Sequence, residues 1–251
     1  MRARLAAMGQ GHWLAFYGLV LAAWALLYAM QLPPDLAAAA RLLGPELWEA
    51  LCSVEPGLAG APTVFLMWAA MAAGMMAPTA LPALATYDDL RASGAGSGAG
   101  FAALLAGYLA VWLGFAALAT AAQIALAGAG LVSPLGTSAS VWLTAALLGL
   151  AGLWQLSALK AACLARCRAP LTFFLQHWAE GAWRMGLRMG FVCLGCCWAL
   201  MALAFVGGTM NLAFMGGAMV LMTLEKLPVG QPLTRPLGAA LLAAALLVLV
   251  L

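Results

Sequence analysis

Three cysteines lie close together inside an apolar stretch of the chain: Cys193, Cys196 and Cys197. In a helix, the spacings i, i+3 and i+4 place their sulfurs on one face within about one turn. Gly186 and Gly190 share this face and would let a neighbouring helix approach closely. Thiolates are soft ligands for Cu(I) or Zn, although a cysteine can also pack as a small apolar side chain. Three thiols on one face favour a metal site or a redox reaction, and we name this group the cysteine cluster.

A second pair, Cys163 and Cys167, repeats the i, i+4 spacing in the preceding segment. Lys160, Arg166 and Arg168 surround it, and nearby positive charge favours the thiolate that binds metal. One Cys-x-x-x-Cys motif is weak evidence for zinc, because such sites usually combine two pairs with further spacing rules. We therefore expect this pair to support the cysteine cluster.

Methionine supplies further soft ligands. Met71 and Met75 share one helical face with Met76 adjacent, while Met201 extends the face of the cysteine cluster and Met210 precedes the next apolar run. Thioether sulfur is uncharged and selective for Cu(I), although methionine stripes in apolar helices usually only pack. The candidate thioether ligands are Met71, Met75, Met76, Met201 and Met210.

The remaining polar residues give weaker signals. His177 lies between the two cysteine groups and is a further candidate ligand, with a simple interfacial position as the alternative. Glu225 and Lys226 are interpreted as an interfacial pair, and the solitary Cys52 as structural. The sequence contains no Gly-rich phosphate loop, catalytic triad or carboxylate dyad, so we do not expect an enzyme.

The elements that must position these residues are transmembrane helices. The chain is 66% hydrophobic and 8% charged, with a mean hydropathy of +1.03, whereas soluble domains carry roughly 25% charged residues. Uniformly apolar runs near the length of a bilayer span are typical of helices rather than barrel strands. We predict an all-α, polytopic transmembrane helix bundle that forms a single membrane domain over residues 1–251. The expected spans, about seven in number, lie at 13–31, 62–85, 100–127, 139–160, 187–207, 209–225 and 236–251, with an interfacial helix at 171–184.

Basic residues predict the orientation of this bundle. With the N-terminus inside and the C-terminus outside, ten of the 11 Lys and Arg residues lie in cytoplasmic segments. We therefore expect a multi-pass protein of the bacterial inner membrane with an uncleaved first span. The net charge of +3 reflects this bias and does not indicate nucleic-acid binding. In this topology Met210 is periplasmic and Cys163 is cytoplasmic, so the sulfur ligands would change from thioether to thiolate along a Cu(I) pathway.

Four motifs resemble the predicted metal-binding integral membrane protein family, which is associated with copper chaperones. They are Met71-x-x-x-Met75-Met76-x-Pro78, Gln155-x-x-x-Leu159-Lys160-x-x-Cys163-x-x-x-Cys167-Arg168-x-Pro170, Cys193-x-x-Cys196-Cys197-Trp198-x-x-Met201 and Met210-Asn211. The resemblance covers about residues 65–228 and implies a membrane protein that binds metal, with some relatives delivering copper to oxidases of the tyrosinase type. Ser157-Ala158 replaces an expected Thr-Pro and Phe214 replaces a common indole. Neither departure removes a sulfur.

The expected function is binding of Cu(I), with zinc as the alternative metal, and its delivery or translocation for maturation of a copper enzyme. The expected partners are the copper ion, the lipid bilayer, and a recipient cuproenzyme or periplasmic copper-binding protein. Two alternatives remain open. A membrane thiol–disulfide carrier is disfavoured because only Cys52 is expected outside, and a structural subunit of a larger membrane complex would use its sulfurs only for packing.

Overall fold

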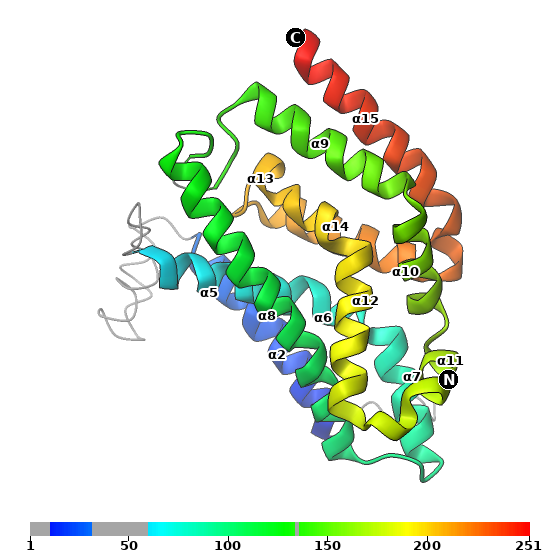
Figure 1. Cartoon of the computed structure of the whole chain (residues 1–251). Coiled ribbons are helices and arrows are strands. Elements are labelled where there is room, and N and C mark those ends of the chain that lie inside the picture. Colours follow the sequence, from blue (N-terminus) through cyan, green and yellow to red (C-terminus); the bar gives the residue numbers. More distant parts are fainter. Residues whose placement is uncertain (1–10, 32–59, 134–135) are drawn as a thin grey trace.

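The computed structural model describes residues 11–31, 60–133 and 136–251 of the chain (Figure 1). Its regular elements are all helical, which confirms the predicted all-α class. Cys52 and residues 1–10 lie outside the described part. The elements are α2 (Gly11–Ala29), α5 (Ala61–Met71), η3 (Ala72–Met76), α6 (Ala77–Thr79), α7 (Leu81–Ala92), α8 (Gly98–Gly128), α9 (Val141–Leu156), α10 (Ala158–Arg168), α11 (Pro170–His177), η4 (Trp178–Glu180), α12 (Ala182–Ala202), α13 (Ala204–Gly207), α14 (Leu212–Lys226), η5 (Pro228–Leu233) and α15 (Thr234–Val250).

Several of these helices are long and apolar enough to cross a membrane. Within the described residues there are five: Gly11–Ala29, Ala61–Thr79, Gly98–Gly128, Ala182–Gly207 and Pro228–Val250, and the bent pair α9–α10 raises the number to six. The 15 residues of α14 extend about 22 Å, less than the roughly 30 Å of a hydrocarbon core. The structure therefore supports a helical membrane protein with five or six candidate spans, and a seventh span and the N-in/C-out orientation stay predictions.

The predicted span at 139–160 is bent, because the helix breaks at Ser157. The backbone of Ser157 is extended, with ψ 147°, and α9 and α10 meet there at an angle of 61°. The Ser157 hydroxyl accepts a hydrogen bond from the backbone N–H of Lys160 at 3.1 Å, so it caps the start of α10. The bend turns α10, which carries Cys163 and Cys167, toward α12.

The predicted interfacial helix at 171–184 is also shorter than expected. Helix α11 ends at His177, a short 3-10 turn follows, and the chain reverses at Gly181, whose φ of +82° favours glycine. Residues 182–184 therefore belong to α12, whose predicted span began at residue 187.

The predicted span at 62–85 ends earlier, at Thr79, because Pro78 disturbs the helix. A π-helical turn over Ala72–Met76 precedes this proline, and α7 begins as a separate helix at Leu81. Proline lacks the N–H that an inner helical turn requires, and π-turns are frequent at functional sites. Here the irregular turn places the Met76 carbonyl where the hydroxyls of Thr79 and Tyr108 donate to it, at 2.8 and 2.9 Å.

Helix α12 packs closely along α8, and α9 packs along α15 (Figure 1). Two glycines of α12 permit the contact with α8. A Cβ added to Gly186 would lie 2.2 Å from the Leu104 carbonyl oxygen, and a Cβ added to Gly190 would lie 2.9 Å from the Tyr108 carbonyl oxygen. This confirms that the glycine face of α12 receives a neighbouring helix. The close approach brings Tyr108 of α8 against Cys193 of α12.

We expect the Gly186→Ala variant to lower the thermal unfolding midpoint in detergent. Its new methyl group would meet backbone, which cannot rotate away, and overpacking of this kind costs about 1–3 kcal/mol. Gly114→Ala on α8 is the matched control, because nothing lies within 4 Å of an added Cβ there. Equal midpoints for the two variants would contradict the close packing of α8 and α12.

Candidate metal centre

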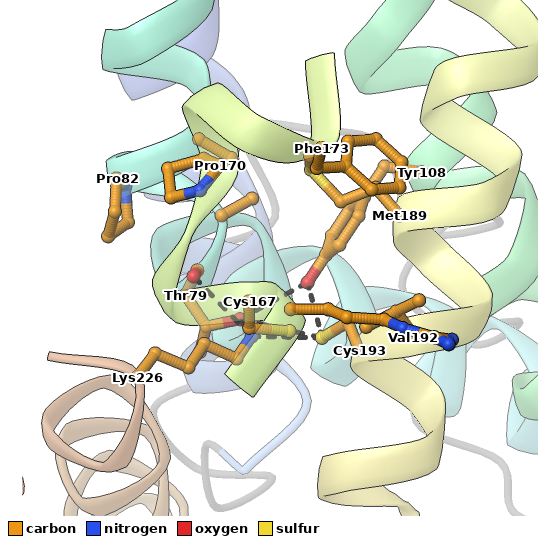
Figure 2. A pocket seen from close by; sticks show the side chains of 13 residues that line it. Thr79, Pro82, Tyr108, Cys167, Pro170, Phe173, Met189, Val192, Cys193 and Lys226 are labelled. Atoms are coloured by element: carbon orange, nitrogen blue, oxygen red, sulfur yellow. Dashed lines mark hydrogen bonds between the residues drawn. The ribbon is translucent and has the colours of Figure 1, made fainter. Parts of the chain in front are cut away.

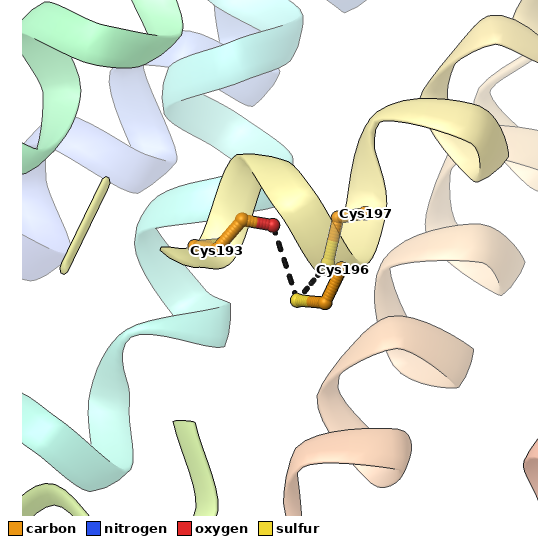
Figure 3. A group of neighbouring side chains, drawn as sticks. All are labelled: Cys193, Cys196 and Cys197. Carbon is orange, nitrogen blue, oxygen red and sulfur yellow. Dashed lines mark hydrogen bonds between the residues drawn. The ribbon is translucent and has the colours of Figure 1, made fainter. Parts of the chain in front are cut away.

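The cysteine cluster occupies one buried face of α12 (Figure 3). The sulfurs of Cys193, Cys196 and Cys197 all lie within 4.8 Å of one another, and those of Cys196 and Cys197 are 3.2 Å apart. Sulfurs bound to one ion at about 2.3 Å would be about 4 Å apart in a trigonal arrangement. Within the described residues, the group of three or more Cys, His, Asp or Glu side chains that is spaced to hold one metal ion consists of these three cysteines.

Helix α10 brings the second cysteine pair to the cluster. An added Cβ on Gly195 would lie 2.7 Å from the Cys163 sulfur, so this thiol contacts the α12 backbone between Cys193 and Cys196. The side chain of Cys167 interacts with the Cys196 thiol. Both thiols of α10 are partly exposed, whereas those of α12 are buried. The two cysteine groups therefore adjoin, with the more accessible pair on α10.

A buried lysine, whose role the sequence pattern did not indicate, faces the cluster (Figure 2). Lys226 Nζ lies 2.9 Å from Cys193 Sγ and donates to the Thr79 hydroxyl, while Tyr108 Oη lies 2.9 Å from the same sulfur. A buried ammonium requires a compensating charge. In the described part of the chain, its hydrogen-bond partners are the Cys193 sulfur and Thr79, so a Cys193 thiolate is the natural counter-ion.

The interpretation of Glu225 and Lys226 as an interfacial pair is wrong, because both are buried and they face different networks. Glu225 Oε2 accepts from Lys160 Nζ at 2.8 Å, and Gln155 bridges the same two side chains. Arg168 donates to the Glu225 carbonyl oxygen. Consecutive residues of a helix do not face each other, and this rule could have predicted that Glu225 and Lys226 do not form a pair.

A narrow cavity joins α10 to the cysteine cluster (Figure 2). Its lining includes Thr79, Tyr108, Cys167, Cys193 and Lys226. The volume in which the centre of a water molecule fits is about 20 Å³. That volume accommodates about one water molecule or ion. The cavity therefore offers room for a single small ion beside two thiols from different helices.

The other predicted ligands lie in different surroundings. Met71, Met75, Met76 and Met201 are buried in the apolar core that also contains the cysteine cluster, while Met210 is partly exposed before α14. His177 lies 3.0 Å from Glu180 and packs its ring on Phe173, with centroids 4.9 Å apart. The structure does not bring His177 into the cluster of three thiols. Metal ligation by each of these residues stays a prediction.

The apolar helices and the buried thiols define the class of a helical membrane protein with a candidate soft-metal centre. The family model described as PpoB2, copper chaperone, matches residues 65–248, well over half of the chain. The chain therefore belongs to this copper chaperone family, and the resemblance that its motifs indicated is confirmed. No curated protein and no solved structure matches the chain. Membership implies copper as the ligand, and all the sulfurs discussed above except Cys52 lie in the matched region.

Proposed function

We propose that the protein holds Cu(I) on Cys193, Cys196 and Cys197 and passes it on for the maturation of a copper enzyme. The observation that carries this proposal is the group of three buried sulfurs within 4.8 Å of one another, in a chain of the copper chaperone family. Thiolates are soft ligands that suit both Cu(I) and zinc. Structural zinc sites almost always have four protein ligands, whereas the buried cluster supplies three, and this favours copper over structural zinc.

Charge also favours a monovalent ion in this place. Cu(I) with two thiolates carries one negative charge, and an isolated charge is costly in a low-dielectric interior. The Lys226 ammonium, 2.9 Å from Cys193, would balance it. A copper-loaded cluster and the lysine would then form an assembly without net charge, while the third thiol stays neutral.

Release requires a route from the buried cluster to a partner. Cys163 and Cys167 adjoin the cluster and are partly exposed, so they offer intermediate ligands between the buried sulfurs and a recipient. In the predicted topology Cys163 and Cys167 lie on the cytoplasmic side, so we propose delivery there, at the bacterial inner membrane, to a cuproenzyme. The basis for this side is the predicted orientation, which puts ten of the 11 basic residues in the cytoplasm.

Deleting the gene should lower the activity of a copper oxidase in the same cell, and added copper should partly restore that activity. The reason is that a delivery protein raises the local supply of copper without taking part in the oxidation. The measurement is oxidase activity in membranes and extracts at several copper concentrations. Loss of activity that copper never restores would argue against delivery and for a structural role.

A membrane thiol–disulfide carrier is the second candidate, because the sulfurs of Cys196 and Cys197 are only 3.2 Å apart. Reactive thiols that exchange with partners are partly exposed, whereas these two are buried. Thiol titration under mild oxidants separates the two functions. A carrier would interconvert reversibly between dithiol and disulfide, and a copper site would be protected from oxidation by its metal.

A further inference from the structure

A second and larger cavity lies beside the metal centre. It has a volume of about 810 Å³ and is lined by segments of α10, α11 and α12. Its polar lining residues are Arg166, Thr172, Gln176, His177 and Arg188. Small-molecule sites typically measure about 300–1,000 Å³ and combine apolar walls with a few polar groups. We name this cavity the vestibule.

We name the narrow cavity beside Cys167 and Cys193 the thiol cavity. It shares three lining residues with the vestibule: Arg166, Phe173 and Val192. Figure 2 shows Phe173 and Val192 around the same cavity as Cys167 and Cys193. A molecule in the vestibule would therefore lie next to the thiols that could accept its metal. Within the described residues, this shared wall connects the vestibule with copper binding and not only with binding of lipid.

The vestibule is positively charged. The residues found to line it include two arginines and no carboxylate, and no ion pair to Arg166 is found within the described segments. Glu180 neutralises part of this charge, because it accepts from Arg188 Nε at 2.5 Å and lies 3.0 Å from His177 Nδ1. The bond from Arg188 lowers the pKa of the Glu180 carboxyl, so the pair stays ionised. The remaining charge on Arg166 suits an anion.

We propose that the vestibule binds an anionic Cu(I) complex of a small thiol that carries carboxylates, and that it presents this complex to Cys167 and Cys193. The proposal rests on the proposed function and names the form in which copper meets the protein. Guanidinium groups bind carboxylates through paired hydrogen bonds. A complex of one Cu(I) and two such thiolates bears a negative charge on the metal centre and on each ligand.

The transfer is a ligand substitution without redox change. A protein thiolate forms a bond to Cu(I), and one bond between Cu(I) and the small thiol breaks. This first ligand leaves as a thiolate, because Cys193 enters already ionised beside Lys226. The Cys167 thiol then replaces the second small thiolate, which takes up the proton that Cys167 loses. Copper stays monovalent throughout, and no oxidant or reductant is needed.

The test uses the full-length protein in phosphatidylcholine nanodiscs, under reducing conditions, with two donors of opposite charge. One donor is Cu(I) bound to 3-mercaptopropionate, and the other is Cu(I) bound to cysteamine. We expect Arg166→Gln/Arg188→Gln to slow copper transfer from the mercaptopropionate complex by about tenfold, a modest loss of electrostatic steering. Transfer from the cysteamine complex should not slow. Arg235→Gln, which lines neither cavity, is the matched control and should behave as the unaltered protein.

Equal slowing with both donors, or no slowing with either, would overturn the vestibule proposal while leaving copper binding intact. A protein that takes no copper from either donor would instead reject the proposed function. Addition of phosphatidylglycerol to the nanodiscs distinguishes a lipid headgroup as the occupant. If this lipid slows transfer from mercaptopropionate as much as the arginine substitutions do, the vestibule is a lipid site and the proposal fails.

Discussion

The Cys196→Ser/Cys197→Ser variant is expected to lose stoichiometric copper while it still folds. Each substitution replaces a soft sulfur ligand by a hydroxyl, which is a poor ligand for Cu(I). Fewer than three sulfurs of the cluster would remain, so the spacing within 4.8 Å that defines the site disappears. Folding should persist because the volume change is small and a serine hydroxyl can donate to a helix carbonyl, as the Cys196 thiol does to the Cys193 carbonyl oxygen.

The measurement is the copper and zinc content of the protein after purification in detergent under reducing conditions, with elution volume as the check on folding. Cys52→Ser is the control, because it removes a thiol outside the matched family region and should keep its copper. Unchanged copper content in the double variant would shift the metal to other ligands. Zinc at stoichiometric level in the unaltered protein, with copper absent, would favour the alternative metal.

The cysteine face of α12 was predictable because it depends only on local geometry. Cys193, Cys196 and Cys197 must share a face in any helix, and the same rule aligned Gly186 and Gly190 with them. The close approach of α8 follows from those glycines. Sequence could not identify α8 as the neighbour, because the hydrophobicity of an apolar helix is similar on every side and does not select a partner.

The break at Ser157 and the position of Lys226 were not predicted, for two different physical reasons. The apolar residues of α9 dominate the average hydropathy of residues 141–160, so this average hides one extended residue whose hydroxyl caps a new helix. Lys226 lies at the end of a short helix, where a lysine ordinarily reaches water at the membrane interface. Its burial depends on Cys193, Thr79 and Tyr108, which come from other segments of the chain. Only the tertiary structure brings these groups together.

Glu225→Leu is expected to cause the largest loss of stability among the substitutions considered. It removes the carboxylate that lies 2.8 Å from Lys160 Nζ, and both side chains are almost fully buried, with 1% and 0% exposure. The uncompensated ammonium should lower the free energy of unfolding by about 3–5 kcal/mol. Because Lys160 is on α10 and Glu225 is on α14, the change should also loosen Cys163 and Cys167 from the cysteine cluster.

The double variant Lys160→Met/Glu225→Leu separates the charge from the packing. Two apolar side chains in place of a buried ion pair are often neutral or stabilising, so the double variant should recover most of the lost stability. The measurement is unfolding in mixed micelles by increasing SDS. It compares Lys160→Met, Glu225→Leu, the double variant and the unaltered chain. If Glu225→Leu unfolds at the same SDS fraction as the unaltered chain, the pair does not hold α10 against α14. If the double variant is as unstable as Glu225→Leu, the loss comes from packing, and the network of Gln155, Lys160 and Glu225 positions the second cysteine pair by shape rather than by charge.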